Sequence, residues 1–377
     1  MKKKKLNALT ISLQNKGHGT LPRQKKMATA LYKDGFNIIW ISPPGYRNKN
    51  FTKINLMMNF LPDLFFIGIY LKVFITCVFN IKYIKNIDVI FAIREYDAIS
   101  IFFNPFFKKS KKIFFSRGDV PSILKINLPD RNFFQKSKDK FVIHFYPFLQ
   151  RLINKKADLI LFQANFLKKI YLKRSKCNLK KIKILSNDCI NINKRTKKNY
   201  NLIKNEISIG FAAPMYWNCK GLGVIVKLYE QLIRKEKNFK LHLAGAGPQA
   251  QKLKNCLQEI SSQNFIWHGW VNNIHKFFEK IDILIIPSLY DSSPNLLFEA
   301  LQNKKLIFAT NISAHKEILK NDNLLFSSNN IENLVLRINR LHSSKNYKLN
   351  LERKLLNVKK KFTFNWEKRF SRLVKKC

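Results

Sequence analysis

Two acidic residues, Asp291 and Glu299, flank the predicted start of a helix in the second half of the chain. Carboxylates accept hydrogen bonds from hydroxyl groups. The backbone N–H groups of Asn295 and Leu296 are the first donors of that helix, and a helix N-terminus carries about half a positive charge that favours anions. These residues together predict a pocket for a ligand that has both a phosphate and hydroxyl groups.

A short strand and a tight loop must hold these groups in place. The run Ile281–Ile286 is apolar except for Asp282 and consists mostly of β-branched isoleucine, which is typical of a strand buried on both faces of a parallel sheet. A polar loop containing Ser292 follows. Ser293 is a favourable N-cap and Pro294 fits the first helical position, so the pattern predicts a helix from there. We therefore count residues 292–296 among the substrate-binding candidates.

Length and composition set the protein class. The chain has 377 residues, 46% of them hydrophobic, which allows two domains and excludes general disorder. The six cysteines form no CxxC pair, which indicates a reducing cytosol without disulfides. The net charge of +47 is spread along the sequence. Compositional drift toward Lys, Asn, Ile and Phe explains this charge as well as a function does. An anionic membrane surface is the first functional alternative, and nucleic acid, for which no motif is present, comes last.

Two segments could be mistaken for membrane or export signals. The N-terminus MKKKKLNALTISLQ has too short an apolar part for a signal peptide, and we expect it to form the first strand. Residues 54–79 are apolar but contain Pro62, Asp63 and Lys72, so we expect a buried or interfacial helix rather than a membrane span. The chain contains no Asp-x-Asp pair, so we predict no metal site and no cofactor.

Strand and helix patterns alternate twice along the chain, with 191–206 as the linker candidate. The first half opens with strand 6–13 and a loop that holds Gly17 and Gly19, whose backbone could approach a ligand. A later strand of this half leads into a loop that holds Arg117 and Asp119. The second half restarts at Ile207–Ala212, followed by a loop with Lys220 and Gly221 and a helix at 222–235. The pattern predicts two α/β domains with parallel sheets.

Four motifs in the second half carry a family resemblance: the Lys220-Gly221 loop, HLAGAGP, IWHGWV with Gly269, and PSLYDSSPNLLFEAL. In this order and spacing, over about residues 205–320, the chain resembles retaining glycosyltransferases of GT-B type, family GT4. The resemblance implies two Rossmann-like domains that face a cleft. It places the acceptor on residues 1–200, joined by the C-terminal helix at about 361–377, and the nucleotide-sugar donor on residues 205–358.

The resemblance also implies roles for single residues. Glu299 matches the acid that binds the nucleotide ribose, and Asp291 stands where the family has a glutamate that contacts the donor sugar. Lys220 matches the lysine that neutralises the diphosphate. The arginine that usually accompanies it is absent, because residues 212–214 read Ala-Ala-Pro. Arg117, with Asp119 nearby, stands near the place of a first-domain histidine and is a further substrate-binding candidate.

The resemblance implies a transferase that moves a sugar, with retention and without a metal, from a nucleotide-sugar to a glycan or lipid-linked acceptor. Such an enzyme would build cell-surface polysaccharide or lipopolysaccharide in the cytoplasm, at the inner face of the membrane. A glycosidase would use two carboxylates differently, with one protonating a leaving group. The alternative is a degenerate relative that binds a nucleotide or an anionic polymer without catalysis, as the missing arginine and the shorter acid at 291 suggest.

Overall fold

The computed structural model describes residues 5–12, 21–43, 49–57, 65–189, 206–235 and 238–377. The chain falls into two compact units. Unit 1 comprises residues 1–121, 137–186 and 365–377, and unit 2 comprises residues 122–136 and 187–364. Gly17, Gly19 and nearly all of the expected linker at 191–206 lie outside the described residues.

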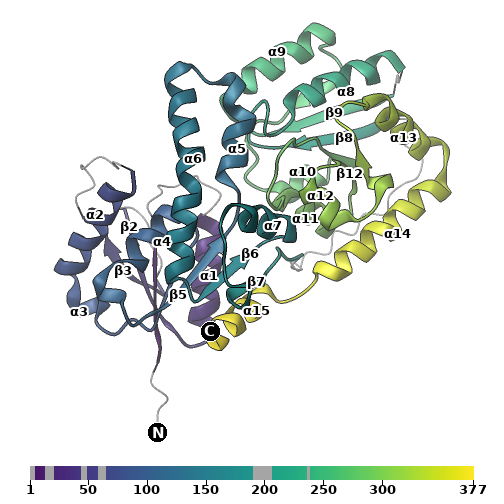
Figure 1. Cartoon of the computed structure of the whole chain (residues 1–377). Helices are drawn as coiled ribbons and strands as arrows, with labels where there is room; N and C mark the ends of the chain where they lie inside the picture. Colours follow the sequence, from purple (N-terminus) through teal and green to yellow (C-terminus); the bar gives the residue numbers. More distant parts are fainter. Residues whose placement is uncertain (1–4, 13–20, 44–48, 58–64, 190–205, 236–237) are drawn as a thin grey trace. The chain divides into compact units, whose positions relative to one another are not determined.

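Unit 1 is built on a seven-stranded parallel sheet in the order β3-β2-β1-β4-β5-β6-β7 (Figure 1). The strands are β1 (Asn7–Ile11), β2 (Asn37–Ser42), β3 (Thr52–Asn55), β4 (Val89–Ala92), β5 (Lys111–Ser116), β6 (Leu159–Phe162) and β7 (Ile182–Ile184). The helices are α1 (Leu21–Lys33), α2 (Phe65–Phe79), α3 (Ile81–Ile84), α4 (Glu95–Phe102), α7 (Asn165–Arg174) and α15 (Trp366–Lys376). The last helix of the chain, α15, packs on the first, α1.

Unit 2 is built on a six-stranded parallel sheet in the order β10-β9-β8-β11-β12-β13. The strands are β8 (Ile207–Ala212), β9 (Phe239–Ala244), β10 (Phe265–Trp267), β11 (Ile283–Ile286), β12 (Leu306–Thr310) and β13 (Leu325–Phe326). The helices are α8 (Leu222–Lys235), α9 (Ala250–Ile260), α10 (Ile274–Phe278), α11 (Asn295–Gln302), α12 (Ser313–Leu319), α13 (Ile331–Ser343) and α14 (Lys345–Phe362). Two helices, α5 (Val120–Asn127) and α6 (Phe133–Lys156), contain residues of both units.

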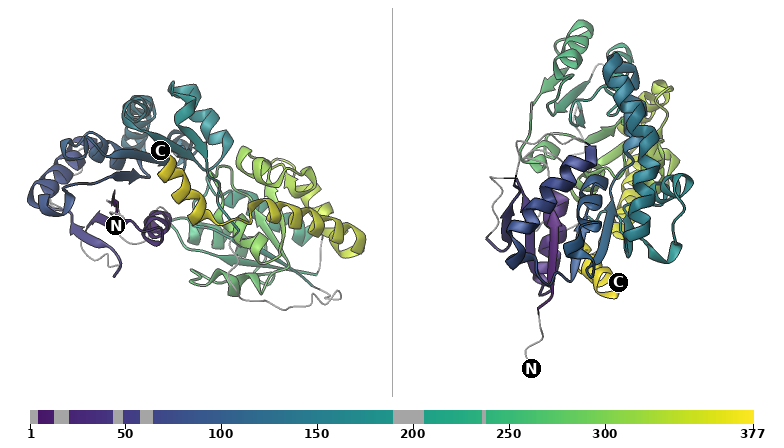
Figure 2. Two further views of the ribbon diagram at one scale, coloured as in Figure 1. Left: turned by 90° about the horizontal axis from the view of Figure 1, so that it is seen from below. Right: turned by 60° about the vertical axis from the view of Figure 1, so that its left-hand side comes forward.

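Each unit has its own hydrophobic core on the faces of its sheet. Figure 2 shows the sheets with their covering helices from two further directions. In β11 all four residues are buried, as the apolar run at 281–286 predicts. The two Rossmann-like parallel sheets predicted from the sequence are therefore confirmed. Two short strands, β3 and β13, are not predicted by the sequence patterns.

Helix α2 belongs to the apolar segment at residues 54–79, for which the sequence predicts a buried or interfacial helix rather than a membrane span. Within the described ranges, no helix is long and apolar enough to cross a membrane. Helix α2 has 15 residues, about 22 Å at 1.5 Å per residue, whereas a bilayer core is about 30 Å thick. One side of α2 is buried, with Val73 and Cys77 fully inaccessible, and the other side is exposed.

Candidate active site

The site lies at the centre of the unit 2 sheet, where the strand order reverses. Strands β8 and β11 are neighbours there, with Ile283 beside Ile209. From β8 the chain continues to β9 and β10 on one side of the sheet, and from β11 it continues to β12 and β13 on the other side. The loops after these two strands therefore diverge and leave a crevice at the carboxyl end of the sheet, which is where open α/β sheets bind ligands. Lys220 follows β8 and Asp291 follows β11.

Gly221 brings the two loops together. Its φ is +66°, and a Cβ atom at this position would lie 2.0 Å from the carbonyl oxygen of Pro287, so only glycine fits. The backbone N–H groups of Leu289 and Tyr290 both donate to the carbonyl of Cys219, at 3.1 and 3.3 Å. These contacts hold the Lys-Gly loop and the loop after β11 together, and the side chain of Lys220 extends from the first of them.

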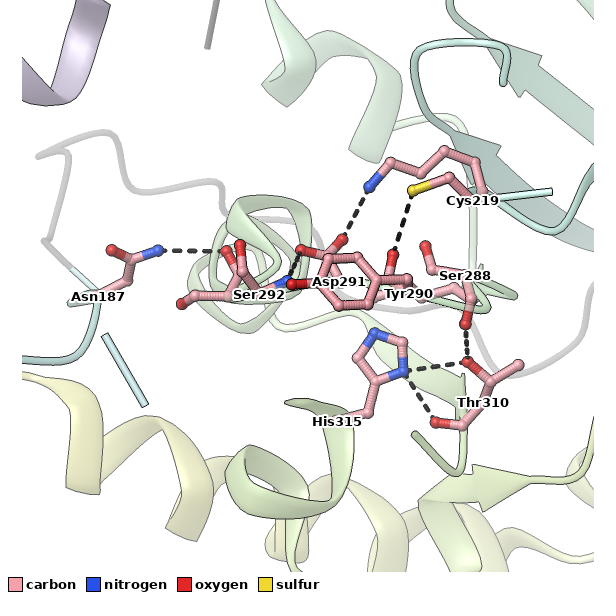
Figure 3. A network of polar contacts seen from close by, with 11 residues as sticks. Asn187, Cys219, Ser288, Tyr290, Asp291, Ser292, Thr310 and His315 are labelled. Atoms are coloured by element: carbon pink, nitrogen blue, oxygen red, sulfur yellow. Dashed lines mark hydrogen bonds and ion pairs between the residues drawn. The ribbon is translucent and has the colours of Figure 1, made fainter. Parts of the chain in front are cut away.

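Lys220 from the first loop and Asp291 from the second form an ion pair (Figure 3). The Lys220 Nζ lies 2.8 Å from Asp291 Oδ2, and the backbone N–H of Ser292 donates to Asp291 Oδ1 at 2.8 Å. The two side chains are only 22% and 14% exposed. Burial acts to lower the pKa of Lys220, but the charge of Asp291, the neighbouring Cys219 and the hydrogen bond to Asp291 together outweigh it and raise that pKa. The lysine is therefore fully charged at neutral pH and is held in place by the acid.

Helix α11 begins one residue later than the sequence predicts. Pro294, with ψ of 106°, is the N-cap, and Ser293 makes no capping hydrogen bond. The prediction of Ser293 as N-cap and Pro294 as the first helical residue is wrong, because Pro294 keeps an extended conformation and only its carbonyl accepts the first helical bond, from Leu297. Within the described chain, no hydrogen bond uses the N–H of Asn295 or Leu296. These two donors remain available for an anion, as expected.

Asn187 fixes the start of this helix from another part of unit 2. Its Nδ2 donates to Asn295 Oδ1 at 2.9 Å and approaches the Ser293 carbonyl at 3.4 Å. Asn187 is 1% exposed, so this contact is shielded from water. Sequence reasoning missed this residue, since nothing near position 187 indicates a partner more than a hundred residues away.

Glu299 lies in the second turn of α11, and burial raises the pKa of its carboxyl group. Its backbone carbonyl accepts from Asn303, but no other described residue forms a hydrogen bond or ion pair with its carboxylate. A half-buried carboxylate without a protein partner can accept hydrogen bonds from ligand hydroxyl groups. The ribose-binding role that the family resemblance implies for Glu299 stays a prediction.

His315 lies behind the loop that carries Asp291 and is fully buried. Its Nδ1 is 2.8 Å from the carbonyl of Thr310, so Nδ1 must carry the proton and donate. The Thr310 hydroxyl bonds the Ser288 carbonyl, which ties β12 to the end of β11. Figure 3 shows the other ring nitrogen pointing toward Tyr290 and Asp291. This nitrogen, Nε2, has no hydrogen-bond partner among the residues that the structure describes. Burial lowers the pKa of His315, so the ring is neutral.

Gly269 and Arg117 are the remaining substrate-binding candidates. Gly269, with φ of +63°, accepts from the N–H of Gly245 at 2.7 Å and so supports the turn after β9. Arg117 follows β5 in unit 1, near Asp119, which pairs with Arg174. Ala213 occupies the loop after β8, where its N–H donates to the Ala244 carbonyl. In the part of the chain that the structure describes, no cluster of three or more His, Cys, Asp or Glu could hold a metal ion.

Comparison with known proteins shows what this part of the chain is similar to. Residues 206–344 match the family model "Glycosyl transferases group 1". This match lies within unit 2, which is therefore similar to a group 1 glycosyltransferase domain. A curated relative, Protein CapJ of Staphylococcus aureus, is 27% identical over 205 residues, which are 53% of this chain and 50% of that protein. The chain therefore matches about half the length of this relative.

Solved structures extend the similarity of fold to the whole chain. WaaG, a glycosyltransferase involved in lipopolysaccharide biosynthesis, has a TM-score of 0.71 at 13% identity and covers 98% of this chain and 99% of its own. Anabaena HepE, solved in complex with UDP and glucose, has a TM-score of 0.71 at 12% identity, with 98% of each chain covered. At these identities the similarity shows the fold alone, and the fold is GT-B.

Proposed function

We propose that the protein is a retaining glycosyltransferase of family GT4 that moves a sugar from a nucleotide-sugar donor to a glycan or lipid-linked acceptor. The observation that carries this proposal is the buried ion pair between Lys220 and Asp291 at the carboxyl ends of β8 and β11, followed directly by helix α11, which bears Glu299 and whose first N–H groups are unpaired within the described chain. The donor binds to this unit, and the acceptor binds to unit 1. HepE, which has this fold, was solved with UDP and glucose, which supports a nucleoside diphosphate sugar as donor.

The chemistry follows from where charge develops. When the bond between the donor's sugar and its nucleoside diphosphate breaks, the nucleoside diphosphate leaves with additional negative charge on its phosphate oxygens. Lys220 and the N–H groups of Asn295 and Leu296 bind that charge in a partly buried place where electrostatic interactions are stronger than in water. A metal ion is not required for this stabilisation, and we propose that the reaction proceeds without one. Addition of a chelator should then leave the rate of turnover unchanged.

The two acids hold hydroxyl groups. Glu299, whose carboxylate has no protein partner among the described residues, binds the ribose of the nucleotide. Asp291 binds the donor sugar, and to do so it exchanges its contact with Lys220 for one with the ligand, while Lys220 turns to the diphosphate. Donor binding therefore replaces one ion pair with two new contacts, so its net electrostatic cost is small.

We further propose that the product belongs to cell-surface polysaccharide or lipopolysaccharide, made at the inner face of the membrane. WaaG, a protein of this fold, takes part in lipopolysaccharide biosynthesis. The high positive charge of this chain favours an anionic membrane surface, where lipid-linked acceptors reside.

A panel of UDP-, GDP- and ADP-sugars, screened by thermal shift and then by release of the nucleoside diphosphate, tests the proposal. We expect one donor to raise the melting temperature and to be turned over, since ligands that bind only the folded state stabilise it. Lys220→Met and Asp291→Asn should abolish most turnover, whereas Lys227→Met, a change of an exposed lysine on α8, should not. NMR of the product anomer tests retention.

A second candidate function is supported by one observation. Strand β8 ends at Ala212, and the loop after it begins with Ala213 and Pro214 and contains no arginine. A chain that had lost catalysis would still bind nucleotide through Lys220 and Glu299. Stabilisation by a nucleoside diphosphate, together with no sugar transfer from any donor in the presence of cell-derived glycan and lipid acceptors, would favour this binding-only protein.

A further inference from the structure

Helix α2 in unit 1 has an apolar side that none of the described residues covers. One side of the helix packs on α4 and buries Val73 and Cys77. The opposite side exposes Ile67, Leu71 and Val78, which lie four and eleven positions apart and therefore share one face. Helices at a protein surface normally present polar residues outward, so this pattern indicates a surface that is covered by something else.

The apolar surface continues past the end of α2. Phe79 is 70% exposed, and Ile81 and Tyr83 on α3 are 54% and 46% exposed. We call the surface formed by these six residues, Ile67, Leu71, Val78, Phe79, Ile81 and Tyr83, the α2–α3 face. Figure 1 shows α2 and α3 at the periphery of their unit.

Lysines surround the α2–α3 face. Residues 65–87 contain no acidic residue and include the exposed Lys82 and Lys85, whereas Lys72 is buried. The segment 105–112, PFFKKSKK, adds the exposed Lys108, Lys109 and Lys111, whereas Lys112 is buried. The ring of Phe106 lies 5.9 Å from that of Phe74 on α2, which holds this segment beside the helix. A hollow of about 1310 Å³ adjoins α3, and its lining includes Lys82, Lys85, Lys108, Lys109 and Lys111. The exposed apolar surface thus has a basic rim.

We propose that the α2–α3 face is the surface by which the protein docks on an anionic lipid bilayer. Apolar side chains with adjacent lysines match the interface of such a bilayer, where hydrocarbon lies beneath phosphate groups. Helix α2 is too short to span the bilayer, so it lies in the plane of the interface. A second copy of the chain fits less well, because a symmetric dimer would bring two basic rims together.

This inference is independent of the proposed transfer reaction, because the α2–α3 face contains none of the residues of the crevice in unit 2. It also differs from general attraction by net charge. Charge alone predicts binding that depends only on lipid charge and salt, whereas docking through the α2–α3 face requires particular apolar side chains. That difference can be measured.

The test is flotation of the full chain with vesicles of phosphatidylcholine containing 30% phosphatidylglycerol, and with pure phosphatidylcholine as reference. We compare the wild type with Leu71→Ser/Phe79→Ser. The control is Leu356→Ser/Phe134→Ser, in which Leu356 is 47% exposed, as is Leu71, and Phe134 is 83% exposed. Thermal unfolding of each variant shows that it is folded, as expected for changes at exposed positions.

We expect binding to the anionic vesicles only, weakening with salt, and a loss of about tenfold for each apolar side chain removed from the α2–α3 face. The control variant should bind as the wild type does. Three results would overturn the proposal: equal binding by Leu71→Ser/Phe79→Ser, a greater loss in the control, or a dimer in light scattering that the same double variant converts to monomer. The last would assign the face to self-association.

Discussion

The ion pair between Lys220 and Asp291 predicts that the two residues respond in opposite ways when a nucleoside diphosphate binds. The pair is 2.8 Å long and is mostly shielded from water, at 22% and 14% side-chain exposure. Breaking a fully buried pair costs about 3–5 kcal/mol, whereas an exposed pair contributes about 0.2–1 kcal/mol. With this intermediate exposure we expect each single variant, Lys220→Met or Asp291→Asn, to lose about 2 kcal/mol of unfolding free energy in urea.

Binding should separate the two variants. Lys220→Met removes a charged hydrogen-bond donor to the diphosphate, which contributes about 1.5–3 kcal/mol, so the dissociation constant for the nucleoside diphosphate should rise about 10- to 100-fold. Asp291→Asn leaves the ammonium group without a competing carboxylate. Affinity for the nucleoside diphosphate should then be unchanged or higher, while affinity for the intact nucleotide-sugar falls because the sugar loses its acceptor.

Calorimetric titration of both variants with the nucleoside diphosphate and with the nucleotide-sugar measures this crossing pattern. Lys227→Met controls for the loss of one positive charge from α8. If Asp291→Asn weakened binding of the free nucleoside diphosphate as strongly as Lys220→Met does, the aspartate would not compete for the lysine, and the reasoning from the ion pair would be refuted.

Further predictions follow from the backbone and from two buried ionisable groups. Gly221→Ala should be more destabilising than Gly269→Ala and should also abolish nucleotide binding. Both residues have φ near +65°, but a Cβ would meet a carbonyl at 2.0 Å in the first and nothing within 4 Å in the second, and equal losses in urea unfolding would contradict this. Burial raises the pKa of Glu95 from 4.5 to about 7, so its stabilising contribution is complete below about pH 4.5 and is lost as pH rises to 7, by about 3 kcal/mol. Glu95→Gln should remove that slope from urea unfolding measured across this range. Burial, with the nearby His268, lowers the pKa of His242 from 6.5 to about 4, so its contribution is complete above pH 6.5 and is lost as pH falls to 4. His242→Asn should flatten the dependence of the unfolding free energy on pH between 4 and 6.5. A pH dependence parallel to that of the wild type would contradict the assignment to His242.

The parts of the site that are encoded locally could be predicted from the sequence. The β-branched run at 281–286 gives a buried strand because each of its side chains meets a sheet face covered by helices. The two free N–H groups at the start of α11 follow from helix geometry, which leaves the first donors unpaired in every helix. The fold class follows from the repeated alternation of such strands with helices.

The parts that depend on tertiary contacts could not be predicted. Ser293 has the side chain of an N-cap, yet Pro294 takes that position. Asn187 contacts both Ser293 and Asn295, although it lies more than a hundred residues earlier in the sequence. The short strands β3 and β13 have too few residues to show periodicity. Likewise, the proton on Nδ1 of His315 is set by the Thr310 carbonyl, which no sequence pattern indicates.

The ion pair itself belongs to this second class, and it changes how the acid at position 291 is understood. From the sequence, Asp291 is a ligand-binding residue that is one methylene shorter than the family's glutamate. In the structure both of its oxygens are already engaged, by Lys220 and by the N–H of Ser292. A partly buried lysine needs a counter-charge when the crevice is empty, and the short side chain, fixed to its own loop, supplies one at 2.8 Å. The acid therefore stabilises the charged lysine before the donor arrives, and the diphosphate replaces it in that role, so the positive charge of Lys220 remains paired in both states.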